Sequence, residues 1–99
     1  MLKGRITKNE EKLDSVLSSV KNLEKALEDF KSNKKNIKTL NKYYGSRKWF
    51  NDKDKYENKK IPQVKAGVLS EDAVWNMFED IDDLLLEMQK IINDYKKNK

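Results

Sequence analysis

Two clusters of side chains in this 99-residue chain have types and spacings that could do chemistry, and the first is acidic. Residues 70–88 hold seven carboxylates and no basic residue, for a net charge of −7. On a helix, Glu79, Asp83 and Glu87 share one face, with Asp80 beside it. Carboxylates can hold Ca²⁺ or Mg²⁺, but the twelve-residue loop of a dedicated calcium site is missing, so we predict no metal site. Two alternatives remain open: pairing with basic residues of the chain, or a surface that binds a basic partner or imitates a phosphate backbone.

The second cluster mixes aromatic and basic side chains. It lies in residues 31–65, where twelve basic and three acidic residues give a net charge of +9. Phosphate contacts combined with ring stacking bind single-stranded nucleic acids. Aromatic side chains also dominate protein interfaces, and small domains need them in their cores. We favour a core position for Tyr44 and Trp49. The candidate partner-binding residues of this cluster are Tyr43, Arg47, Lys48, Trp49 and Phe50.

Catalysis has little support in the composition. The chain contains no histidine and no cysteine, so it lacks the commonest general base, a thiolate nucleophile and the usual zinc ligands. Ser70 has no such base near it in sequence, and helix capping explains it fully. We therefore expect a protein that is not an enzyme and that has no catalytic residues and no cofactor.

The first half of the chain has the apolar spacing of a long helix. There is no glycine or proline between Arg5 and Tyr44. Alternating steps of three and four indicate a single helical seam. We favour one helix over residues 1–44, bent near Ser32; the alternative is a first helix ending near Ser32 and a second over about 34–44. The seam residues are Leu13, Val16, Val20, Leu23, Leu27 and Phe30, with the rhythm continuing through Lys34, Ile37, Asn41 and Tyr44.

A second long helix is predicted over residues 70–97. Ser70 is the expected N-cap, and Glu71 and Asp72 lie in the first turn, where the helix dipole favours negative charge. Its seam follows steps of four and three without interruption. The seam residues are Val74, Phe78, Ile81, Leu85, Met88, Ile92 and Tyr95.

The segment between these helices, residues 45–69, is predicted to be a short helix and a long loop. Gly45 ends the first helical stretch, and Ser46 caps a helical turn that extends to Phe50. Residues 51–60 are almost wholly polar and predict a solvated loop. The fold class is therefore all-α: one domain in which two long helices pack as an antiparallel hairpin or small bundle. Because two such seams exceed what one chain covers, we also expect a homodimer at micromolar concentration.

Two short motifs resemble a known protein family. They are the segment from Tyr43 to Trp49, with Tyr-Tyr-Gly-Ser and then Trp, and the segment from Gly67 to Asp72, with Pro62 between them. Together they resemble a bacterial family known as domain of unknown function 4298, over nearly the whole chain. The resemblance implies a small helical protein with a coiled-coil-like first helix, and it implies no catalytic residues.

The charge layout leads to the last expectations. We predict that the −7 helix and the +9 segment face each other, at least in part, within the folded chain or across a dimer, because each alone repels itself. The charged first eleven residues are unlike a signal peptide and no apolar run matches a membrane span, so we expect a cytoplasmic protein with no membrane partner. We expect a binding or adaptor module acting through protein–protein contacts. The alternative is a nucleic-acid-associated regulator or a phage or mobile-element inhibitor of a nucleic-acid enzyme.

Overall fold

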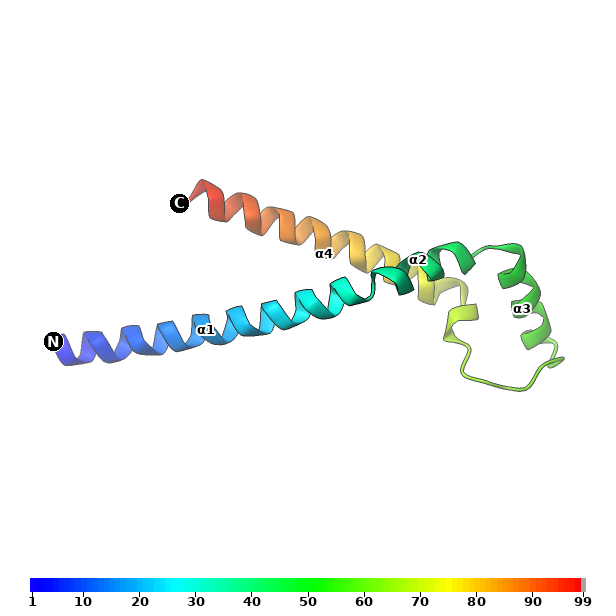
Figure 1. Ribbon diagram of the computed structural model, residues 1–99, viewed down its shortest axis with the longest axis horizontal. Coiled ribbons are helices and arrows are strands. Elements are labelled where there is room, and N and C mark those ends of the chain that lie inside the picture. Colours follow the sequence, from blue (N-terminus) through cyan, green and yellow to red (C-terminus); the bar gives the residue numbers. More distant parts are fainter. Residues whose placement is uncertain (99) are drawn as a thin grey trace. The chain divides into compact units, whose positions relative to one another are not determined.

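The chain is all-α. The structure, a computed structural model, describes residues 1–98 and contains four α-helices, one 3-10 helix and no strand in that part of the chain (Figure 1). The predicted fold class is thereby confirmed, while the antiparallel packing of the two long helices stays a prediction. The elements are α1 (Leu2–Ser32), α2 (Lys34–Tyr43), α3 (Arg47–Glu57), η1 (Gly67–Leu69) and α4 (Glu71–Lys97).

These elements belong to two compact units, each described here by itself. The first covers Met1–Lys38 and consists of α1 and the first turn of α2. The second begins at Thr39 and contains the end of α2 together with α3, η1 and α4. No helix within residues 1–98 combines the length and the apolar character needed to span a bilayer.

The first helical stretch is interrupted at Asn33, which corrects the preference for one continuous helix. The backbone N–H of Asn33 donates to Phe30 O at 3.1 Å, a three-residue step that tightens the last turn of α1. The carbonyl of Asp29 instead accepts from Ser32 Oγ at 2.7 Å and from Asn33 Nδ2 at 2.9 Å. Short polar side chains that compete for backbone partners in this way end the helix.

A second correction concerns residues 51–57, which were predicted as loop and form most of α3. Ser46 caps this helix as expected, because its Oγ accepts from the N–H of Trp49 at 3.2 Å. The inward face of α3 consists of Trp49, Asp52, Lys53 and Tyr56, at helical spacing. Two of these four are charged, so the face shows no apolar periodicity in the sequence.

A small core lies where α3, η1 and α4 meet. The extended segment after α3 leads into η1, which contacts both α3 and the start of α4 (Figure 1). Within the described residues the buried apolar side chains are Trp49 from α3, Leu69 from η1 and Val74 from α4. We call these three residues the Trp49 core. Gly45, with φ of +77°, allows the turn that brings α3 after α2, because only glycine adopts such values without strain.

The predicted cap of α4 is confirmed. Ser70 Oγ accepts from the backbone N–H groups of Asp72 and Ala73, both at 3.3 Å. Ser70→Ala removes the acceptor for both donors, and we expect it to lower the free energy of unfolding by about 1 kcal/mol. Urea melts of wild type, Ser70→Ala and Ser70→Asp test this. The aspartate variant, which keeps an acceptor, should retain the wild-type midpoint; an alanine variant that also retains it would contradict the assignment.

Candidate partner-binding surfaces

Trp49 anchors the second unit and is not available to a partner. Its side chain is only 3% exposed. The indole Nε1 donates to Val68 O at 2.9 Å, which fastens α3 to the segment entering η1. Its ring packs edge-on against Tyr44 and Phe50, with centroid distances of 5.1 and 4.9 Å. The core interpretation of Trp49 therefore agrees with the structure.

Two tyrosine hydroxyls tie the surrounding segments to this core. Tyr44 follows α2 and donates to the carbonyl of Glu71, in the first turn of α4, at 2.6 Å. Tyr56 in α3 donates to Val64 O at 3.1 Å and so holds the extended segment that precedes η1. The polar ends of these rings bond to backbone while their bodies pack, as expected of tyrosine at the edge of a small core.

Tyr43 has a partner within the chain. Its hydroxyl donates to Asp52 Oδ2 at 2.6 Å, joining the end of α2 to α3. This hydrogen bond, with some desolvation and the negative charge of Asp52, raises the pKa of Tyr43 from 10.0 to about 12. The phenol is therefore a structural donor to a carboxylate at neutral pH.

The raised pKa of Tyr43 predicts a specific alkaline sensitivity. Between about pH 10 and 12 the folded chain keeps a proton that the unfolded chain releases, so this contribution to stability is complete below pH 10 and is lost as pH rises toward 12. We expect the difference in urea midpoint between wild type and Tyr43→Phe to shrink over that range. A difference that stays constant from pH 9 to pH 12 would contradict the Tyr43–Asp52 bond.

The predicted aromatic and basic cluster is thus divided by the structure. Trp49 is buried and Tyr43 is half-buried, whereas Arg47 and Lys48 are exposed in the first turn of α3. Phe50 is 59% exposed although one side of its ring contacts Trp49. The part of the cluster that a partner could touch is therefore Arg47, Lys48 and Phe50.

The predicted acidic residues lie together on α4. All four are exposed: Glu79, Asp80, Asp83 and Glu87. Within residues 39–98 none of them forms an ion pair. No group of three or more possible metal ligands is arranged to hold an ion in the part of the chain that the structure describes. The acidic face is therefore open to solvent in this unit.

The basic segment does meet the acidic run at its beginning. Lys53 Nζ lies 3.7 Å from Glu71 Oε1 and 2.6 Å from Glu57 Oε1. The hydrogen bond to Glu57 raises the pKa of the Lys53 amine. The predicted charge complementarity is therefore seen at the first turn of α4, through a lysine on the inward face of α3, and in residues 39–98 it does not extend to Asp80 or Asp83.

An exposed apolar stripe runs along α1, and its residues were not among those predicted to bind a partner. The first unit offers this 31-residue helix no second long element to pack against, and none of its residues is buried. The sequence signal, a regular three-and-four spacing, was visible but was assigned to packing within the chain. The members of this surface, the α1 seam, are between 38% and 60% exposed: Leu13, Val16, Val20, Leu23, Leu27 and Phe30.

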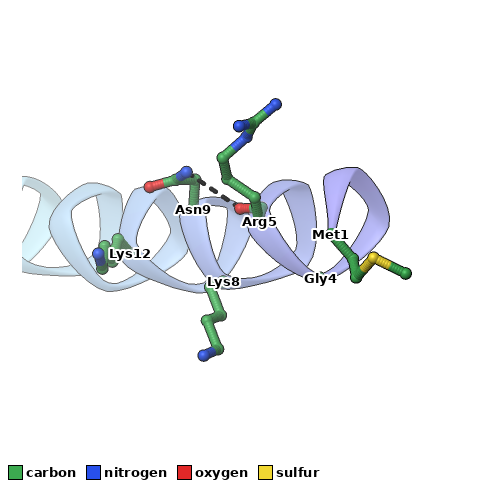
Figure 2. Close-up of a pocket in the computed structure, with 6 residues that line it drawn as sticks. All are labelled: Met1, Gly4, Arg5, Lys8, Asn9 and Lys12. Atoms are coloured by element: carbon green, nitrogen blue, oxygen red, sulfur yellow. Dashed lines mark hydrogen bonds between the residues drawn. The ribbon is translucent and has the colours of Figure 1, made fainter.

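A shallow hollow near the N-terminus of α1 has a basic lining but no convergent groups. Its lining residues include Met1, Gly4 and Asn9 as well as Arg5, Lys8 and Lys12. Figure 2 shows the Arg5 and Lys8 side chains pointing away from each other, on opposite sides of the helix. The Asn9 amide Nδ2 is engaged with Arg5 O at 3.0 Å. The arrangement does not focus positive charge on one point.

Comparison with known proteins places the chain in a family. No curated protein and no solved structure matches it. A family described as Domain of unknown function (DUF4298) matches residues 6–91, which includes both motifs noted in the sequence, and the chain therefore belongs to this family.

Proposed function

We propose that this protein is a small, non-enzymatic binding module that holds a protein partner through the α1 seam. One observation supports this most: a 31-residue helix presents six seam side chains, each at least 38% exposed, along one face. Helices of globular proteins gain most of their stability by packing an apolar face. Exposed apolar stripes of this kind are typical of interaction sites.

The character of the seam fits an amphipathic helix as the partner's binding element. Aliphatic side chains at three-and-four spacing form the ridges and holes that receive the knobs of another helix. The second unit complements this role because Trp49, Leu69 and Val74 give it a core of its own. The composition supports a role without catalysis, since the chain lacks histidine and cysteine.

The test compares two double variants in capture from an extract of the native host. Val16→Glu with Leu23→Glu puts charge into the seam. Ser18→Glu with Asn22→Glu introduces two glutamates, and the same charge change of −2, on the opposite face of the helix as a matched control. We expect the seam variant to capture at least tenfold less partner protein than wild type does. The control variant should capture as much as wild type. Circular dichroism checks that both variants keep their helices.

Equal retention by the two variants would overturn the proposal. The salt dependence of the remaining binding then tests the alternative, in which the protein binds nucleic acid through Arg47, Lys48 and Phe50. Phosphate contacts give a steep fall of affinity with salt, whereas an apolar seam does not. Loss of binding in Phe50→Ala together with a steep salt slope would favour nucleic acid.

A further inference from the structure

We propose that the α1 seam is occupied by α1 of a second copy of this chain, running parallel and in register. This inference rests on the proposed function, since it names the partner of the same surface. Its basis is the order of residues around the seam, which discriminates between parallel and antiparallel pairing.

The α1 seam continues toward the N-terminus as a heptad pattern that starts at Leu2 and covers four heptads, the length at which a coiled coil can form. From Leu2 to Phe30, all the inward positions are apolar except Asn9. Three of the four a positions hold residues that α1 leaves about half exposed, at 55% for Ile6, 49% for Leu13 and 45% for Val20. The a positions are Ile6, Leu13, Val20 and Leu27, and the d positions are Leu2, Asn9, Val16, Leu23 and Phe30.

Asn9 favours the parallel arrangement. In a parallel pair in register, each d residue faces its own copy, so the two Asn9 amides meet each other. In an antiparallel pair with full overlap, a residues face d residues, and Asn9 would face the apolar side chain of Leu27. A polar group placed against an apolar one loses hydration without gaining a partner, whereas two facing amides can hydrogen-bond to each other.

The charges beside the seam give the same answer independently. In a parallel pair, each g residue faces the e residue five positions later in the other chain, so that Arg5 meets Glu10. None of the remaining pairs of a g residue with the facing e residue brings two like charges together. Antiparallel overlap instead places Glu10 against Glu24 and Lys3 against Lys31, and symmetry doubles each repulsion. Complementary charge therefore selects the parallel pair of copies.

Single cysteines test the arrangement on a clean background, because the natural chain has none. Leu23→Cys lies at a d position, where a parallel pair brings the two sulfurs together. Ser18→Cys lies on the outer face and reports random collision. Under mild oxidation at micromolar concentration, we expect Leu23→Cys to form at least ten times more disulfide-linked dimer than Ser18→Cys. Wild type should sediment as a dimer over the same range.

A mixture of Leu13→Cys and Leu23→Cys identifies the antiparallel pair, which would give the mixed disulfide in excess. That result, or equal crosslinking by Leu23→Cys and Ser18→Cys, would overturn the parallel dimer. If crosslinking is absent but the seam still captures a different protein, the second copy is refuted as the occupant and the proposed function stands. If both are absent, the proposed function fails with it.

Discussion

Trp49→Ala is expected to lower the free energy of unfolding of the second unit by about 3–5 kcal/mol. The indole is 3% exposed, contacts two other rings and donates a hydrogen bond to Val68 O. Alanine would leave a cavity in a core that contains few other buried side chains, and the Val68 carbonyl would lose its partner. Both effects act on the junction of α3 and η1.

The other tryptophan provides a matched control. Trp75 lies in α4, one position after Val74, and is 56% exposed. We expect Trp75→Ala to change stability by under about 1 kcal/mol, since exposed substitutions usually have small effects. Urea melts followed by far-ultraviolet circular dichroism compare the two. Equal shifts in midpoint for both variants would contradict the assignment of Trp49 as the anchor of the core.

Leu69→Ala has the second largest expected effect, about 2–3 kcal/mol. Leu69 is 9% exposed and is contributed by η1, the short element that contacts both α3 and α4. Removing its side chain should loosen both contacts at once.

Leu86→Ala in α4 is the control for this substitution. It makes the same chemical change at a residue that is 57% exposed, in a helix where leucine and alanine have similar propensities. The expected change is under about 0.5 kcal/mol. A Leu86 variant as destabilised as the Leu69 variant would mean that the distal part of α4 is packed, and that η1 is not the centre of the core.

The elements that local chemistry determines could be predicted from the sequence. Ser46 and Ser70 cap helices because their hydroxyls reach backbone donors two or three residues ahead. Gly45 follows α2 because glycine adopts its φ of +77° without strain from a side chain. The all-α class followed from apolar spacing, which depends only on the helical repeat.

The elements that depend on contacts distant in sequence could not be predicted. The length of α3 was missed because Asp52 and Lys53 on its inward face are matched by Tyr43 and Glu71, which are 9 and 18 positions away. The break at Asn33 depended on which donors compete for the Asp29 carbonyl. Composition and periodicity contain neither kind of information.

The candidate site shows the same division. Trp49 is buried, in agreement with the favoured core interpretation, whereas Arg47, Lys48 and Phe50 beside it are exposed and their role in partner binding stays a prediction. The α1 seam was visible as a pattern, yet a pattern of apolar residues does not say whether its partner is the same chain or another. That distinction is left to experiment, while the order of Asn9 and of the charged residues beside the seam bears on the orientation that a second copy would take.

Photo-crosslinking in living host cells tests most directly whether the α1 seam is the binding face. A benzoylphenylalanine residue is placed either at Val16, in the seam, or at Ser18, on the outer face of the same helix. We expect irradiation to give a defined crosslinked product, with a second copy or another protein, from position 16 and none from position 18. Products of equal yield from both positions, or a product from position 18 alone, would contradict the α1 seam as the surface through which this protein acts.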